Sequence, residues 1–263
     1  MPLVHLLPPA LVLLATVTMP SLANEGTAKS ELAPTGTLRV GLVEAPSAGV
    51  LFIGPVKGEP KGVTADLSAD LAEKAELPVT YTVFPNTGAA TAALQAGSID
   101  VSYMPVDAAR RQVLDFGPGY YDLESTYLAS GASGMADVAQ VDRPGIRVVA
   151  IDGTTTIRAS ARTLKQTQPV GVPSVAEAVE LMRTGQADAF ALSRDTLKPI
   201  LSEVPGSRIV AGGFQRTQVA VALPKSRPTA LAFVSAWLDG AKQSGLVRRI
   251  FDAHGFASES VAP

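Results

Sequence analysis

The sequence predicts an α/β protein built from two similar lobes, and two observations carry this prediction. First, short β-rich runs alternate with helical segments along the chain, which is typical of βαβ units and a mostly parallel sheet. Second, parts of the two halves match in the same order: GTLRVGLVE from Gly36 parallels GIRVVAID from Gly145, and LQAGSID over 94–100 parallels MRTGQAD over 182–188. A single match of this kind could arise in any α/β protein, because helix–glycine–strand connections recur in this class. Two matches in the same order favour two lobes of similar structure.

Hydrophobic patterning places the elements of the first half. In chain order we expect a strand over 38–43, a helix over 65–77, a strand over 79–84, a helix over 88–96 and a strand over 99–104. The strands are rich in β-branched and apolar residues. The first helix has Leu67, Leu71 and Ala75 on one face, and Pro78 closes it. Gly97 is placed to end the second helix in a left-handed conformation.

The pattern then restarts in the second half. We expect a strand over 124–130, a polar connection over 131–145, a strand over 146–151, a helix over 154–165, a short strand over 170–172, a helix over 174–184 ending at Gly185, strands over 187–192 and 218–223, and helices over 229–244 and 246–254. Paired α/β lobes leave a cleft at the carboxyl ends of their strands, where polar ligands bind.

Composition excludes several classes of function. The 263 residues carry 22 basic and 24 acidic side chains, and this net charge of −2 gives no general attraction to nucleic acid. Cysteine is absent, which excludes disulfides, thiolate nucleophiles and cysteine-based metal sites. Histidine occurs only at His5 and His254, which argues against a histidine metal site or a Ser–His–Asp triad. We therefore expect no metal and no cofactor.

The N-terminal residues predict export. The apolar run ALVLLATV over 10–17 is followed by the small residues Ser21 and Ala23, so 1–23 is predicted to be a signal peptide cleaved after Ala23. The leader contains no Lys or Arg, and an uncleaved anchor is the alternative. The apolar run is shorter than the roughly 20 residues that a membrane span needs. We expect a periplasmic protein whose residues 24–36 form a flexible lead-in.

Several motifs carry a resemblance to a known family. They are GVTADL over 62–67, the Gly97–Asp100 joint, DAAR over 107–110 and DFGPGYY over 115–121. In these segments the chain resembles the family 3 solute-binding proteins, type II periplasmic receptors of ABC importers that typically bind amino acids. The similarity extends over most of 37–255, and the spacing from Arg110 to Asp115 is its most specific part.

The resemblance implies a fold and a function. The fold would be the two-lobed type II periplasmic-binding-protein fold, in which each lobe is a mostly parallel sheet flanked by helices and two hinge crossings join the lobes. Lobe one would comprise 37–127, with 219–263 returning to it, and lobe two would comprise 128–218. The protein would be a monomer that captures a small polar solute, an amino acid or small carboxylate, and delivers it to an ABC permease in the inner membrane.

Two segments are candidates for holding a ligand carboxylate. Arg110 is assigned this role by the resemblance, and a guanidinium suits it because its planar fork donates two parallel hydrogen bonds. Its alternative is a salt bridge to Asp107 or Asp115. The second candidate is the run Thr154, Thr155 and Thr156 at a helix start, where free N–H groups and the helix dipole favour an anion. Its alternative is simple helix capping.

The sequence departs from the family pattern at other positions. Ser193, followed by Arg194 and Asp195, stands where the family usually has an Asp for the ligand ammonium, and Asp107 replaces a usual Thr. Either Asp107 binds the ammonium, or it pairs with Arg110 and the ligand is not an α-amino acid. Met104 replaces a usual small residue. Glu44, directly after the first strand, is a further candidate acid of the ligand pocket. Its alternative role is to cap the loop that follows this strand. Ser193, Asp195, Met104 and Glu44 complete the candidate ligand residues.

Two other functions are compatible with the same scaffold. Some family relatives resemble periplasmic enzymes such as cyclohexadienyl dehydratase, in which carboxylates donate protons. In this chain Glu44 and Asp107 would have to serve. The third possibility is a receptor that reports its ligand to a membrane sensor. The fold alone does not decide among them.

Overall fold

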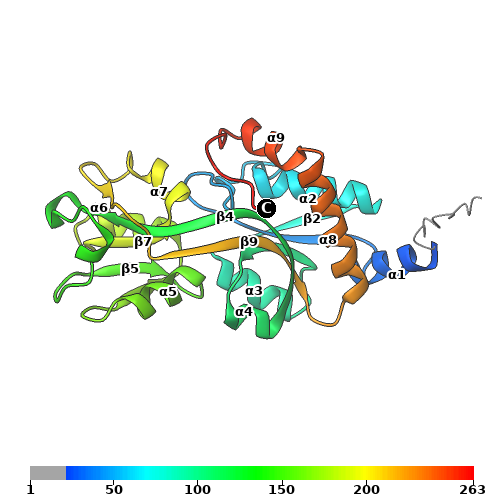
Figure 1. Ribbon diagram of the computed structural model, residues 1–263, viewed down its shortest axis with the longest axis horizontal. Coiled ribbons are helices and arrows are strands. Elements are labelled where there is room, and N and C mark those ends of the chain that lie inside the picture. Colours follow the sequence, from blue (N-terminus) through cyan, green and yellow to red (C-terminus); the bar gives the residue numbers. More distant parts are fainter. Residues whose placement is uncertain (1–21) are drawn as a thin grey trace, which may run out of the picture.

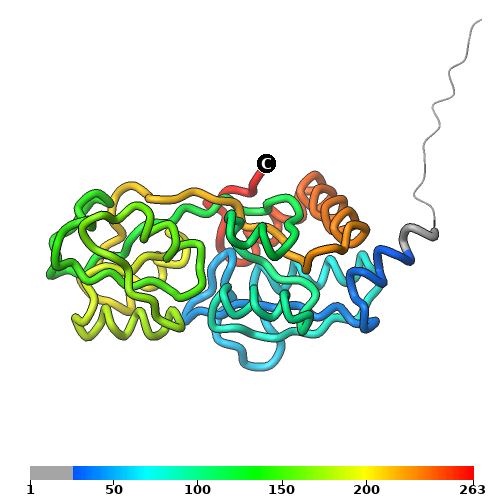
Figure 2. The backbone as a smooth tube through the Cα atoms, turned by 90° about the horizontal axis from the view of Figure 1, so that it is seen from below, coloured from blue at the N-terminus to red at the C-terminus, as the bar shows by residue number. Residues whose placement is uncertain are grey.

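The computed structural model describes residues 22–263 and shows two lobes joined by a pair of long strands (Figure 1). The predicted signal peptide over 1–23 lies outside this range except for its last two residues, so it stays a prediction. Within 22–263, no helix combines the length and the apolar character that a membrane crossing needs. Figure 2 shows the two lobes side by side from another direction.

The elements divide between the lobes. Lobe one contains α1 (Leu22–Leu32), β1 (Leu38–Val43), α2 (Val63–Ala75), β2 (Val79–Phe84), α3 (Thr87–Gln95), β3 (Val101–Pro105), α4 (Ala108–Val113), α8 (Pro228–Gln243) and α9 (Leu246–Ala253). Lobe two contains β5 (Val148–Ile151), α5 (Thr155–Thr163), β6 (Pro169–Val172), α6 (Val175–Arg183), β7 (Ala189–Ser193), α7 (Arg194–Ile200) and β8 (Arg208–Ile209), with short 3-10 turns at Gly131–Ser133 and Val138–Gln140. The two long strands are β4 (Leu114–Ala129) and β9 (Gln215–Pro224).

The strands form a sheet in the order β2-β1-β3-β9-β4-β7-β5-β6, and β8 pairs with β4. Pairing is parallel for β1 with β2 and β3, and for β5 with β6 and β7. It is antiparallel wherever β4 or β9 takes part. These two strands pair with each other from Leu114–Pro224 to Ser125–Gln215 and are the two crossings between the lobes (Figure 1). The predicted two-lobed α/β fold is confirmed, whereas the residue limits assigned to each lobe stay a prediction.

The sequence repeat corresponds to the same ion pair in both lobes. In lobe one, Arg39 Nε and Nη2 donate to the two carboxylate oxygens of Asp100, each at 2.8 Å. In lobe two, Arg147 Nε and Nη2 donate to Asp188 at 2.9 and 2.7 Å. Each arginine lies near the start of the first strand of its lobe, and each aspartate follows a helix that ends at a glycine. Each pair therefore ties two neighbouring parallel strands together.

The glycines placed at the helix ends have the expected conformation. Gly97 and Gly185 both have φ +68° and follow the last residues of α3 and α6. A left-handed residue at this position lets the backbone leave the helix, and glycine does so without a Cβ clash. The helix over 63–75 ends earlier than predicted, because Glu76 takes the left-handed conformation (φ 52°) before Pro78 is reached.

The expectation of a flexible lead-in over 24–36 is wrong, because this segment contains most of α1. Leu32 is fully buried, and α1 packs against α8 at the outer end of lobe one (Figure 1). The Glu31 carboxylate accepts hydrogen bonds from the backbone N–H groups of Thr229 and Ala230, at 2.8 and 3.0 Å. These are free donors of the first turn of α8, so α1 supplies a cap that residue Arg227 does not provide.

Three further elements differ from prediction. The short helices α4 and α7 were not expected, and β4 begins at Leu114 rather than at 124. The segment Gly117-Pro118-Gly119 is typical of a turn, yet it lies inside β4. The pairing of β4 with β9 shifts register on both sides of Gly119, so the turn-like segment is accommodated as an irregularity in the strand.

Candidate functional site

Arg110 reaches the space between the lobes because of a local turn at the end of β3. The strand ends at Pro105, and Asp107 then caps α4 by accepting a hydrogen bond from the backbone N–H of Arg110 at 2.8 Å. The Arg110 side chain is 2% exposed, whereas its neighbour Arg111 is exposed and lies over the Phe116 ring at 5.8 Å. Adjacent residues of α4 thus point in different directions, and only Arg110 lies in the interlobe region.

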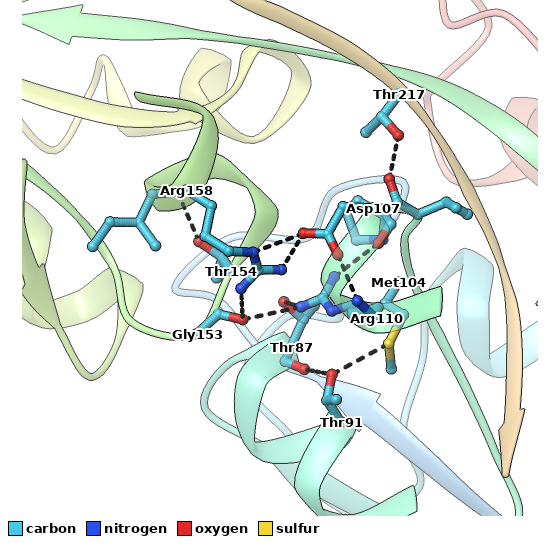
Figure 3. A network of polar contacts seen from close by, with 12 residues as sticks. Thr87, Thr91, Met104, Asp107, Arg110, Gly153, Thr154, Arg158 and Thr217 are labelled. Atoms are coloured by element: carbon cyan, nitrogen blue, oxygen red, sulfur yellow. Dashed lines mark hydrogen bonds and ion pairs between the residues drawn. The ribbon is translucent and has the colours of Figure 1, made fainter. Parts of the chain in front are cut away.

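The Arg110 guanidinium binds neutral oxygens from both lobes (Figure 3). Nη1 donates to the Pro105 carbonyl at 2.8 Å, and Nη2 donates to Thr87 Oγ1 at 2.6 Å and to the Gly153 carbonyl of lobe two at 3.2 Å. Nε is buried and has no hydrogen-bond partner in the described part of the chain. Burial and the nearby Arg158 cation lower the pKa of Arg110 to about 9. Neither predicted alternative holds, since Asp115 pairs with Lys225 and Asp107 pairs elsewhere.

The threonine run opens α5 from the other lobe. Thr154 caps the helix, because its Oγ1 accepts from the Ile157 N–H at 3.2 Å and donates to the Ile151 carbonyl at 2.7 Å. Capping therefore accounts for Thr154 alone. Thr155 is 1% exposed, and its Oγ1 lacks a hydrogen-bond partner among residues 22–263. Thr156 is also buried.

Asp107 pairs with Arg158, an arginine that none of the sequence motifs indicated. Arg158 Nε donates to Asp107 Oδ2 at 2.8 Å, its Nη2 contacts the same oxygen, and its Nη1 donates to the Gly153 carbonyl at 3.1 Å (Figure 3). Burial opposes the charge of Asp107, but the Arg110 N–H and the Arg158 guanidinium outweigh it and lower its pKa. One signal was available: Arg158 follows Thr154 by four residues, so both lie on the same face of α5.

A small cavity of about 20 Å³ lies between the two lobes. Its lining combines hydroxyl and apolar groups: Leu51, Phe52, Thr87, Pro105, Leu123, Thr154, Thr155, Thr156, Leu192 and Ser193. A cavity needs roughly 10–15 Å³ to hold one water molecule. Any solute of amino-acid size therefore requires the lobes to move apart at this point.

Of the four remaining candidate residues, only Ser193 lines the small cavity. Glu44 is exposed and lines a separate cavity of about 370 Å³ beside the start of α6. Met104 is fully buried, and its sulfur accepts from Thr91 Oγ1 at 3.4 Å. Asp195 is 3% exposed and accepts from the Val50 N–H at 3.1 Å, and burial raises its pKa. Ser193 lines the small cavity and bonds to Thr196 Oγ1 at 2.8 Å.

Two α/β lobes, two crossing strands and an interlobe cavity lined by a helix start and by two residues that bind a buried guanidinium define a two-lobed binding protein. The model of the bacterial extracellular solute-binding proteins, family 3, matches residues 39–256, and the chain belongs to this family. The ABC transporter glutamine-binding protein GlnH of Bacillus subtilis (strain 168) is 22% identical over 201 residues, which cover 75% of this chain and 73% of that protein.

Solved structures show the same fold. A mutant of ArgBP from T. maritima has a TM-score of 0.75 and 21% identity, covering 86% of this chain and 98% of that one. AbpA from Streptococcus pneumoniae, an amino acid ABC transporter substrate-binding protein bound to L-arginine, has a TM-score of 0.74 and 19% identity, covering 87% and 98%. The ancestral amino acid-binding protein AncCDT-1, a precursor of cyclohexadienyl dehydratase, has a TM-score of 0.73 and 24% identity, covering 86% and 98%.

Proposed function

We propose that this protein is a periplasmic solute-binding protein, exported through a cleaved signal peptide, that works as a monomer. It captures a small carboxylate-bearing solute, an amino acid or a simple carboxylate, between its lobes and delivers it to an ABC permease. Arg110 binds the solute carboxylate, and the α5 start with Thr155 and Thr156 contacts it from the other lobe. Similarity to transporter-associated proteins supports the permease as partner.

One observation carries this proposal: Arg110 is a buried cation whose guanidinium contacts no carboxylate within 22–263. Its Nε and the Thr155 hydroxyl are both buried donors without partners. Burying a charge and leaving donors unpaired are both costly. A carboxylate placed between them neutralises the charge and supplies the missing acceptors.

Closure of the lobes follows from the same geometry. Arg110 of lobe one and Arg158 of lobe two both donate to the Gly153 carbonyl, so the site is complete only when the lobes meet. Hinge motion along β4 and β9 opens the way in, and a solute that contacts both lobes stabilises the closed form. The permease then has a distinct closed shape to recognise.

The geometry gives less support to the dehydratase alternative. That reaction needs a carboxyl group able to donate a proton. Asp107 is held ionised by Arg158, and Glu44 lines a different cavity. Incubation with prephenate or arogenate tests this alternative directly, since release of an aromatic product would favour the enzyme.

The main test is melting of the purified protein against a library of amino acids and small carboxylates. A bound solute raises the melting temperature with increasing concentration. We expect Arg110→Gln to weaken binding by about 10- to 100-fold, because a charge-assisted hydrogen bond contributes about 1.5–3 kcal/mol. The exposed neighbour supplies the matched control, and Arg111→Gln should bind as the wild type does. A library without any hit, or an Arg110→Gln protein that binds normally, would refute the proposal.

A further inference from the structure

Hydrogen-bond acceptors beside the interlobe cavity are already occupied by guanidinium groups. The Pro105 carbonyl accepts from Arg110, and the Gly153 carbonyl accepts from both Arg110 and Arg158. At this place Arg110 Nε is a buried donor without a partner among the described residues, and so is the Thr155 hydroxyl, which can also accept. Asp195 Oδ1 is also buried and unpaired, but Asp195 does not line the cavity. A ligand carboxylate finds an unpaired donor at this place, whereas a ligand ammonium would have to share its carbonyl acceptors with guanidinium groups.

Both carboxylate oxygens of Asp107, the acid beside Arg110, also have hydrogen-bond donors already. Asp107 Oδ1 accepts from the Arg110 backbone N–H, and Oδ2 accepts from Arg158. The Asp107 side chain is 10% exposed, whereas that of Arg158 is 31% exposed, so the acid is largely buried beneath a partner that water still reaches. Among the described residues that line the cavity, none is acidic. Arg158 therefore holds the position that a ligand cation would need in order to reach Asp107.

Charge balance leads to the same conclusion. Arg110 and Arg158 bring two positive charges, and Asp107 brings one negative charge, so the closed site carries a net charge of about +1. An α-amino acid is a zwitterion and leaves this charge uncompensated. Its ammonium would also approach two guanidinium groups, which is unfavourable in a buried site. A monocarboxylate without an amino group neutralises the site.

The rest of the lining favours an apolar body on that carboxylate. The apolar side chains of the lining come from both lobes and the crossing strand and are those of Leu51, Phe52, Leu123 and Leu192. Apolar surface of this kind stabilises hydrocarbon by about 25 cal/mol per Å² removed from water. The site thus combines one anion receptor with an apolar wall.

On the basis of the proposed function, we infer that the solute is an apolar carboxylate that lacks an α-ammonium group, such as a 2-oxo acid or a desamino acid. Arg158 is then a specificity-determining residue, because it neutralises Asp107 and excludes the amino acid of the same skeleton. Glu44 does not alter this selection, since it lines the other cavity.

Matched sets of ligands test the inference by titration calorimetry on the wild-type protein. The sets are alanine with pyruvate and propanoate, leucine with 4-methyl-2-oxopentanoate and 4-methylpentanoate, and phenylalanine with phenylpyruvate and 3-phenylpropanoate. We expect the 2-oxo or desamino acid of at least one set to bind ten or more times as tightly as its amino acid. The inference would be overturned if, in every set with a measurable ligand, the amino acid bound at least as tightly as its 2-oxo and desamino counterparts.

Variants separate the inference from the proposed function on which it rests. Arg158→Met frees the Asp107 carboxylate and should shift the preference at least tenfold toward the amino acid. The exposed Arg162 on the same helix is the matched control, and Arg162→Met and Glu44→Gln should keep the wild-type ratio. If amino acids bind best and Arg110→Gln still abolishes binding, only the inference fails. If no ligand of any set binds, the inference and its basis fail together.

Discussion

Asp107 has two structural roles, because its two carboxylate oxygens have different partners. Oδ1 caps α4 within lobe one, and Oδ2 holds Arg158 of lobe two. The cap is a local interaction that stabilises by about 1 kcal/mol. The ion pair joins the lobes and depends on charge. A change that removes the charge and keeps an acceptor oxygen therefore separates the two roles.

Asp107→Asn is such a change, and its effect should depend on pH. The folded-state pKa of Asp107 is lowered, so the ion pair stabilises fully above the unfolded pKa and is lost as the pH falls through the folded value. Between about pH 6 and about pH 3, the melting temperature of the wild type should fall more steeply than that of Asp107→Asn. Circular dichroism melts over this range measure it. The exposed Asp122→Asn serves as control, and parallel curves for wild type and Asp107→Asn would contradict the expectation.

At the scale of elements, the two lobes use the same Arg–Asp pair in different surroundings. The Asp100 side chain is fully buried and also accepts from Arg227 at 3.2 Å. The Asp188 side chain is 21% exposed, and that of its partner Arg147 is 53% exposed. A buried pair leaves an uncompensated charge when one partner is removed, whereas a pair that water reaches is screened.

The two pairs should therefore differ in what their loss costs. We expect Asp100→Asn to lower the free energy of unfolding by about 3–5 kcal/mol, because two half-buried arginine groups lose a fully buried counter-charge. Asp188→Asn should cost about 1 kcal/mol or less. Urea unfolding of both variants beside the wild type gives the comparison. An equal decrease in the free energy of unfolding for both variants would show that burial does not control the strength of these ion pairs.

At the scale of the whole molecule, the lobes approach each other at two glycines. A Cβ atom added at Gly88 of α3 would lie 2.9 Å from the Gly153 Cα and 3.2 Å from the Asp152 carbonyl oxygen, both in lobe two. The same interface contains a hydrogen bond from Asn86 Nδ2 to the Pro173 carbonyl at 2.8 Å. Backbone atoms cannot yield as a flexible side chain does, so the absence of a side chain at Gly88 is what permits this closure.

Gly88→Ala should hold the lobes apart. The helical backbone of α3 accepts alanine readily, so we expect the variant to fold and to show both a larger radius of gyration and weaker solute binding. Small-angle X-ray scattering and calorimetry measure the last two. Gly240→Ala in α8 is the matched control, because a Cβ there meets no atom within 4 Å. An unchanged scattering profile for Gly88→Ala would show that closure does not need this contact.

Much of the architecture was predictable because its signals are local. Strand patterning placed β1 and β2 with the observed limits, and the glycines at 97 and 185 ended their helices as expected. The cap at Thr154 corresponds to the alternative interpretation of the threonine run, and the predicted ligand roles of Arg110 and the threonines stay predictions. By contrast, α1 looked unstructured because its stabilising contacts lie on α8, far along the chain. The turn-like Gly117-Pro118-Gly119 segment became part of β4 only through pairing with β9.

Local patterns in the chain were enough to indicate the α/β class, the internal repeat and an arginine and a threonine run suited to an anion. These features depend on residue type and on neighbours within a few positions. Three features became visible only in the folded chain: Asp107 pairs with Arg158, Glu44 and Asp195 do not line the small cavity, and Arg110 has no carboxylate partner among 22–263. The physical reason is that a charged side chain pairs with whatever the closed lobes bring near it, and residues distant in the sequence supply those groups.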